Sequence, residues 1–378
     1  MSTLERNNLG IDIIGFPRGK LGIGDQVRSL VKMSIINGYE VNLIDCIHPT
    51  DNIINDHMEY NHLISNTFKY PIRIYSLTQN HIAALIYRFG VNFFDCKNNI
   101  FQLAWEFDER PTQLDTALKF ADEIWGISSF TSKAFENNYG IPVETMHNAV
   151  ELPALYDCTR DNFNLPVDLY LFCFSFDFNS WTTRKNPGAV IEAFKLSGLN
   201  KKGAGLVIKV SNVNTFSEEW INFLHDIKYI DNIYVINKTM DKPDVISLFR
   251  CCDCYVSLHR SEGFGMGMAE NMLLGKPVIC TGFSGNMDFC NDDNAYIVDY
   301  SIVVSSESDY TFSEGFKWAD PDIKSSASKM INVFDNQSKA KEKGQKAMNY
   351  INKKFTPAAL APHFDDLIQN FLERKKLI

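Results

Sequence analysis

CYVSLHRSEGFGMGMAENMLLGKPVIC, residues 254–280, carries the clearest fold signal in the chain. An apolar run with β character opens it at 254–258, and a second apolar run closes it at 277–280. Between them lie a glycine-rich loop and a helical segment that carries Glu270. The loop glycines are Gly263, Gly265 and Gly267. This order predicts a strand, a loop, a helix and a strand, which is the repeating unit of a parallel sheet covered by helices.

The same alternation runs through the whole chain. In the first half, the expected strands are IDIIGF (11–16), VNLI, IRIYSL, NIFQLAW and DEIWGI. In the second half, they are LYLFCFSF (169–176), GLVIKV (205–210), IYVI (233–236), CYVSL, PVIC and AYIV (295–298). Helical segments separate them, for example at 25–37 and 187–197. We therefore predict an α/β protein with two Rossmann-like doubly wound domains facing a cleft, where such sheets bind ligands.

A break in both periodicities marks the expected domain boundary. LPALYDCTRDNFNLPVD, residues 152–168, is rich in Pro, Asp and Asn. We predict an N-terminal domain over 1–155, a C-terminal domain over 165–355 and a final helix over 356–378. That helix starts with Thr356 as N-cap and has an apolar face, so we expect it to pack back on the N-terminal domain.

Composition excludes several classes of protein. The 37 Lys and Arg against 46 Asp and Glu give a net charge of −9, which opposes binding to nucleic acid. No apolar run approaches the roughly 18 residues of a membrane-spanning helix, and the N-terminus lacks the layout of a secretory signal. Nine cysteines, an odd number in scattered positions, fit a reducing cytosol. The basic segment 339–378 is either a solvated helix face or a peripheral contact with anionic lipid at the inner face of the membrane.

The glycine-rich loop suggests anion chemistry. Glycines allow a ligand to approach the backbone, and exposed amides at a helix start favour an anion such as a diphosphate. Glu262 in the loop and Glu270 on the helix are two acceptors suited to hydroxyl-rich groups, one on a sugar and one on a ribose. A plain turn and a capped helix would account for the same residues taken singly.

The longer string SEGFGMGMAENMLLGKPVICTGFSGN, residues 261–286, resembles the signature of family 4, or group 1, retaining glycosyltransferases. That family has the two-Rossmann GT-B fold. Further similar segments follow in the expected order, at 15–31, 99–111, 121–151, 184–194 and 316–323. The resemblance implies that the N-terminal domain binds the acceptor and the C-terminal domain binds the nucleotide-sugar.

The resemblance also implies roles for residues of the second domain. Glu270 would hold the ribose hydroxyls, and Glu262 would contact the donor sugar or its phosphate neighbourhood. The backbone of the loop would cradle sugar and phosphate, at Gly263, Phe264 and Gly265. Lys185, at the start of helix 187–197, matches the family's diphosphate lysine. An arginine common about five residues earlier is Ser180 here, so the adjacent Arg184 is the candidate for the second cation.

In the first domain, Gly22 and Gly24 resemble the glycine loop that meets the donor phosphate, ahead of helix 25–37. Glu106 follows the strand NIFQLAW, where many family members place a histidine. Three roles remain open for Glu106: it orients an acceptor hydroxyl, stabilises positive charge at the anomeric carbon, or forms an ion pair with Arg110.

The resemblance implies a retaining, metal-independent transferase, most simply a hexosyltransferase. The donor would be UDP- or GDP-linked, with no further cofactor, and the acceptor a glycan or lipid-linked glycan of cell-surface polysaccharide such as lipopolysaccharide or capsule. The one DxD, Asp320 to Asp322, is better read as a helix cap than as a metal site. Two alternatives stay open: a catalytically silent nucleotide-sugar-binding or scaffold protein, and a sugar phosphorylase or epimerase.

Overall fold

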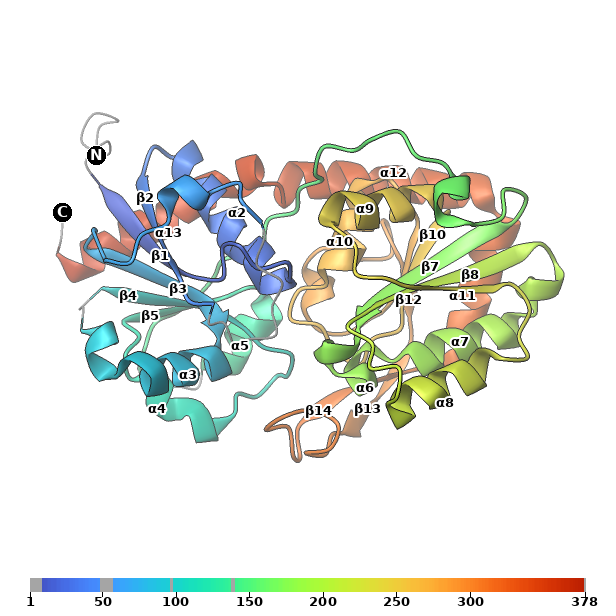
Figure 1. The fold of residues 1–378 in the computed structure, drawn as a ribbon, viewed down its shortest axis with the longest axis horizontal. Coiled ribbons are helices and arrows are strands. Elements are labelled where there is room, and N and C mark those ends of the chain that lie inside the picture. Colours follow the sequence, from blue (N-terminus) through green and yellow to red (C-terminus); the bar gives the residue numbers. More distant parts are fainter. Residues whose placement is uncertain (1–8, 48–56, 96–97, 137–139, 377–378) are drawn as a thin grey trace. The chain divides into compact units, whose positions relative to one another are not determined.

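The computed structural model describes residues 9–47, 57–95, 98–136 and 140–376, and the chain divides into two compact units. Unit 1 contains Met1–Val150 and Lys353–Ile378, and unit 2 contains Glu151–Asn352. Each is an α/β unit built on a six-stranded sheet (Figure 1).

Unit 1 has a parallel sheet in the order β2-β1-β3-β4-β5-β6. The strands are β1 (Gly10–Gly15), β2 (Glu40–Asp45), β3 (Ile72–Thr78), β4 (Asn99–Ala104), β5 (Glu123–Gly126) and β6 (Val143–Thr145). The helices are α2 (Gly22–Ile36), α3 (Gln79–Phe89), α4 (Asp115–Leu118), α5 (Ser129–Glu136) and α13 (Pro357–Lys375). Within this unit, α2 and α13 cover one face of the sheet, and α3 and α4 lie on the other (Figure 1).

Unit 2 has a parallel sheet in the order β12-β11-β10-β7-β8-β9. Its strands are β7 (Tyr170–Asp177), β8 (Ala204–Ser211), β9 (Ile233–Asn237), β10 (Cys254–Ser257), β11 (Val278–Thr281) and β12 (Tyr296–Val298). An antiparallel pair, β13 (Tyr300–Val304) and β14 (Lys317–Pro321), is added to them. The helices are α6 (Thr182–Lys185), α7 (Pro187–Ser197), α8 (Glu218–Ile227), α9 (Lys242–Cys251), α10 (Met266–Leu273), α11 (Ile323–Asp335) and α12 (Gln337–Lys354).

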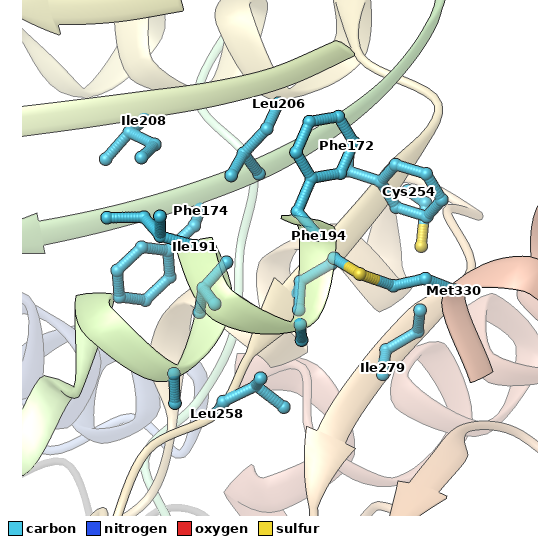
Figure 2. Packing of buried hydrophobic residues seen from close by; sticks show 14 of the residues in the cluster. Phe172, Phe174, Ile191, Phe194, Leu206, Ile208, Cys254, Leu258, Ile279 and Met330 are labelled. Atoms are coloured by element: carbon cyan, nitrogen blue, oxygen red, sulfur yellow. The ribbon is translucent and has the colours of Figure 1, made fainter. Parts of the chain in front are cut away.

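The core of unit 2 explains why its strands read as continuous apolar runs. Figure 2 shows Phe172 and Phe174 of β7 packed with Leu206 of β8 and Phe194 of α7, and all four side chains are buried. Because helices cover both faces of this sheet, strand side chains on either face are buried away from water. Burial of each such side chain stabilises the fold by about 1.5–3 kcal/mol.

Helix α13 completes the core of unit 1. The apolar face expected for residues 356–378 is buried there, and Phe364 packs edge-on against the rings of Tyr39 and Trp125. Thr356 caps the helix by accepting a hydrogen bond from the amide of Ala359. The end of the chain therefore folds with its beginning.

The observed boundary differs from the predicted one. The units divide at 150/151 and 352/353 rather than at 155–165 and 355/356. The reason is that the segment after Val150 is bonded to unit 2: Tyr156 donates a 2.6 Å hydrogen bond to Asp244, and Arg160 forms an ion pair with Asp253 at 2.7 Å. Turn-rich composition locates a linker but does not show which unit holds it.

Candidate functional site

The turn from β10 into α10 is shaped by its glycines. Gly265 precedes α10 with φ +98°, a conformation that side chains rarely adopt, and a Cβ there would lie 2.4 Å from the Met268 methyl. A Cβ on Gly267 would lie 2.6 Å from the Tyr255 hydroxyl. Two of the three loop glycines are therefore required by the turn and by packing, whatever ligand the loop binds.

A second turn, after β11, fixes Glu262 from both sides. The Glu262 amide donates to the Ser284 hydroxyl at 2.8 Å, and the Glu262 carbonyl accepts from the Gly285 amide at 2.9 Å. A Cβ on Gly285 would lie only 2.0 Å from the Gly263 carbonyl oxygen. Close contact of these two backbone segments holds the carboxylate of Glu262 in one place.

A third segment, between β7 and α7, brings the cations. Its backbone is pinned to the β10–α10 turn because the Arg260 amide donates to the Arg184 carbonyl at 2.8 Å and Asn186 donates to the Leu258 carbonyl at 3.1 Å. The predicted helix 187–197 is α7, and Lys185 lies just ahead of its first residue. Lys185 ends the separate four-residue helix α6, and Asn186, with φ +56°, turns the chain into α7. The N-terminal dipole of α7 therefore does not explain the position of Lys185.

Glu262 is the centre of a buried ion cluster. The Lys185 ammonium lies 2.5 Å from Oε1, and Arg184 Nη1 lies 3.1 Å from Oε2. Glu262 is 9% exposed and Arg184 is 5% exposed. Burial raises the pKa of the Glu262 carboxyl, but the charges of Lys185 and Arg184 outweigh burial and lower that pKa to about 2. Glu262 is therefore ionised at neutral pH and has no proton to donate.

The two cations differ in how they are held. Arg184 also donates to the Ser261 carbonyl at 3.0 Å, so its guanidinium is bound to the protein on more than one side. The Lys185 side chain is 21% exposed, against 6% for Arg184, and it ends in a flexible ammonium. Lys185 is the cation better able to turn toward a ligand, and Arg184 is the one better able to hold Glu262.

Glu270 is held by a residue that sequence reasoning missed. It lies on α10 and is 4% exposed, and its carboxylate forms an ion pair with Lys242 in the first turn of α9. Burial is the main cause that raises the pKa of the Tyr255 phenol, and the nearby charges of Cys173, Glu262 and Glu270 raise it further. Lys242 and Glu270 are too far apart in sequence for any local pattern to link them.

His259 lies in the segment 254–280, and the sequence predicts no role for it. Its Nδ1 lies 3.0 Å from the Ser257 hydroxyl, and its Nε2 lies 3.0 Å from Asn286 Oδ1 and 3.2 Å from the Phe283 carbonyl. Because both partners of Nε2 are acceptors, Nε2 carries a proton. Burial also lowers the pKa of His259. The ring therefore ties the turn after β11 to the end of β10.

The remaining predicted residues belong to unit 1. Gly22 and Gly24 do not precede the helix as expected; they form the first turn of α2. A Cβ on Gly24 would lie 2.1 Å from the Gly19 carbonyl, whereas a Cβ on Gly22 would meet nothing within 4 Å. Gly24 is therefore required by the turn, whereas position 22 has room for a side chain.

Glu106 follows β4 and is half-buried. The adjacent backbone is fixed, because the Trp105 carbonyl accepts from Thr131 at 3.0 Å and the Trp105 indole donates to the Glu109 carbonyl at 2.6 Å. Arg110, the ion-pair partner considered for Glu106, forms an ion pair with Asp115. The functional roles of Glu106 stay predictions.

Asp320 and Asp322 have structural partners. Asp322 accepts from the Ser325 amide at 2.8 Å as the N-cap of α11, and Asp320 pairs with Arg260 at 2.9 Å. Across the described ranges, no group of three or more His, Cys, Asp or Glu side chains could hold a metal ion. Nor does the described part of the chain contain a helix long and apolar enough to cross a membrane.

Comparison with known proteins places this site in a family context. Residues 178–349 match the family described as Glycosyl transferases group 1, and this segment lies wholly within unit 2. All the site residues described above in unit 2 fall inside it. Comparison with curated protein sequences gives no match.

The whole chain is similar in fold to solved structures. Anabaena Alr3699/HepE in complex with UDP-glucose has a TM-score of 0.68 at 14% identity, over 95% of this chain and 99% of that chain. Sucrose-phosphate synthase (tll1590) from Thermosynechococcus elongatus has a TM-score of 0.69 at 14% identity, over 97% of this chain and 100% of that chain. The pneumococcal O-GlcNAc transferase GtfA in complex with UDP and GlcNAc has a TM-score of 0.57 at 12% identity, over 86% of this chain and 62% of that chain.

These likenesses confirm the predicted fold class: two Rossmann-like α/β domains of the GT-B type. The group 1 domain in unit 2 marks the chain as a glycosyltransferase, the enzyme class that the sequence resemblance implied.

Proposed function

We propose that the protein is a retaining, metal-independent glycosyltransferase of family 4 that transfers a hexosyl group from a nucleotide-sugar. The observation that carries this proposal is the buried cluster of Lys185, Arg184 and Glu262 on the segments that lead into α7 and α10. Breaking a glycosyl–phosphate bond leaves negative charge on the departing nucleoside diphosphate, and fixed cations stabilise such charge.

Within this proposal, Lys185 contacts the departing diphosphate and Glu262 holds Lys185 in place until the donor binds. Arg184 keeps Glu262 oriented through its bonds to the carboxylate and to the Ser261 carbonyl. The bond from the anomeric carbon to the phosphate oxygen breaks, and the acceptor hydroxyl attacks from the same face. Its proton passes to the departing phosphate oxygen, so no step needs a protonated Glu262, in agreement with its low pKa.

For the donor, UDP-linked sugars are the first choice and GDP-linked sugars the second. Support comes from fold relatives, since Alr3699/HepE was solved with UDP-glucose and GtfA with UDP and GlcNAc. In this chain Glu270 would accept from the ribose hydroxyls, and the backbone of Gly263, Phe264 and Gly265 would lie against sugar and phosphate.

For the acceptor, we propose a glycan or lipid-linked glycan of a surface polysaccharide such as lipopolysaccharide or capsule. Exposed lysines on α12, at Lys339, Lys341 and Lys346, suit contact with anionic lipid headgroups. The enzyme would then work in the cytoplasm at the inner face of the membrane.

The test is a two-stage assay on the purified chain. A thermal-shift screen with UDP, GDP and their sugars finds the donor, because a ligand that binds only the folded state raises the melting temperature. Product analysis with that donor, in the presence of a chelator, then shows the linkage formed. A lengthened acceptor with retained configuration and free nucleoside diphosphate is the expected result. A sugar phosphate product, an epimerised donor, or absence of any nucleotide binding would contradict the proposal.

A further inference from the structure

The ion pair between Lys242 and Glu270 has no role in the function proposed so far. Glu270 is 4% exposed, so its carboxylate has left water and needs a partner charge. Lys242 supplies that charge from another helix, and its side chain is 34% exposed. A carboxylate has about four lone-pair positions, so it can accept from an ammonium and from hydroxyl donors together.

We propose that Lys242 is a positioning residue for the ribose of the donor: it orients the Glu270 carboxylate so that the carboxylate accepts from the ribose hydroxyls. This inference rests on the proposed function. Its physical basis is that Lys242 starts α9, where the backbone is held by the helix, and reaches across to α10. Without Lys242, the buried carboxylate loses the ammonium that pairs with it.

Calorimetric titration with UDP and with 2′,3′-dideoxy-UDP tests the inference. Lys242→Met should weaken UDP binding about tenfold, the scale of a charge-assisted hydrogen bond, but change binding of the dideoxy compound less than about threefold. Lys242→Arg should restore most of the affinity. In a Glu270→Gln background, Lys242→Met should have no further effect, because the two residues act as one unit.

Controls separate this inference from the proposed function. Lys201→Met, at an exposed lysine of the same unit, should leave both affinities unchanged, and melting curves check that each variant is folded. Equal weakening of UDP and dideoxy-UDP in Lys242→Met, or no weakening of either, overturns the role of Lys242 while the wild type still binds UDP. Failure of the wild type to bind either UDP or GDP overturns the proposed function and this inference together.

A different observation concerns two cysteines outside the site. Cys158 Sγ lies 3.5 Å from Cys251 Sγ, and both residues are half-buried rather than buried. Arg160 holds the Cys158 segment on unit 2 by donating to the Cys251 carbonyl at 3.0 Å. Arg250 Nη2 donates to Cys158 Sγ at 3.4 Å. No disulfide joins any of the eight cysteines in the described part of the chain.

We infer that Cys158 and Cys251 are a modification site that hydrogen peroxide converts into a reversible disulfide. The Cys158 thiolate attacks peroxide, forming a sulfenic acid and hydroxide; Cys251 sulfur then attacks that sulfur and releases water. Overall, two thiols and one peroxide give one disulfide and two waters. Burial raises the pKa of Cys158, but hydrogen bonds from Arg250 and Cys251 outweigh burial and lower that pKa, so Cys158 is the attacking thiol.

Peptide mapping by mass spectrometry tests this site. After a small molar excess of peroxide, the wild type should yield a peptide pair linked between Cys158 and Cys251, and dithiothreitol should separate the pair. The link closes a loop with a sequence separation of 93, so the oxidised protein should melt about 5 °C or more higher. Cys158→Ser and Cys251→Ser should each abolish both effects. Oxidation of Cys158 to sulfinic acid without the link, or a link between other cysteines, overturns the inference.

Discussion

The turn after β1 in unit 1 and the turn after β10 in unit 2 have the same form, since each joins a buried strand to a helix through glycines. In unit 1 two arginines hold the turn: Arg28 donates to the carbonyls of Pro17 and Gly19 at 2.9 and 3.0 Å and to Asp25 at 2.5 Å, and Arg18 pairs with Asp45 at 2.5 Å. In unit 2 the turn contains buried charges, with Glu262 paired to two cations. Burying a carboxylate and two cations costs several kcal/mol per ion before pairing, which a turn of purely structural function does not need.

The comparison teaches that the same strand–turn–helix pattern can serve structure alone or can hold charged side chains in position for a ligand. In the unit 1 turn Arg28 holds two backbone carbonyls, whereas in the unit 2 turn two cations share the buried Glu262 carboxylate and the Lys185 side chain stays partly exposed. Four changes test this contrast, from the largest expected effect to the smallest.

Lys185→Ala should reduce turnover by about 10²–10³, the scale of losing one donor that stabilises developing negative charge. Lys185→Arg keeps a cation and should recover part of the rate. The measurement is kcat with a saturating donor, and Lys195→Ala on the exposed side of α7 is the matched control. Unchanged turnover in Lys185→Ala would remove Lys185 from the catalytic machinery.

Glu262→Gln tests the electrostatics of the cluster through pH. The folded pKa of about 2 lies below the unfolded value near 4.5, so the ionised carboxylate stabilises the fold above pH 4.5. That contribution, about 3 kcal/mol, is lost as the pH falls from 4.5 toward 2. The glutamine variant should therefore be less stable than wild type at pH 6, and the difference should shrink in acid.

Urea unfolding over that pH range measures the gap, which is the difference in free energy of unfolding between wild type and Glu262→Gln. Glu219→Gln, at an exposed carboxylate on α8, is the control, and its free energy of unfolding should differ very little from that of wild type at every pH. A gap that stays constant down to pH 2 would mean that Glu262 does not titrate with the depressed pKa.

Much of the fold could be predicted from sequence because strands that are buried on both faces have continuous apolar sequences, as in CYVS of β10. Contacts between side chains of different helices and strands could not be predicted from sequence. The Lys242–Glu270 contact joins two helices, and nothing in either segment reports the distance between them. The sequence also did not show that Lys185 ends a separate helix, because that depends on the positive φ of Asn186, which ends one helix and starts another. The division of the chain at Val150 depends on hydrogen bonds of Tyr156 and Arg160, which composition does not show.

Gly285→Ala should destabilise unit 2 by about 1–3 kcal/mol, the cost of forcing an atom into a filled space. The new Cβ would lie 2.0 Å from the Gly263 carbonyl oxygen, and a backbone atom cannot swing away as a side chain can. The two segments that fix Glu262 must then separate, so donor KM should rise as well. Thermal melting and donor titration check both effects. A variant as stable as wild type would show that the two turns are not in close contact.

Gly22→Ala is the counterpart in unit 1 and should have the opposite sign. A Cβ there meets nothing within 4 Å, and Gly22 opens α2 without a positive φ. Alanine reduces the freedom of the unfolded chain and should stabilise the protein by about 0.4–1 kcal/mol, measured by urea unfolding. Destabilisation would mean that the turn after β1 is as tightly packed as the turn after β10. Donor KM is the second readout, because a rise in KM together with the gain in stability would identify Gly22 as a contact of the donor phosphate.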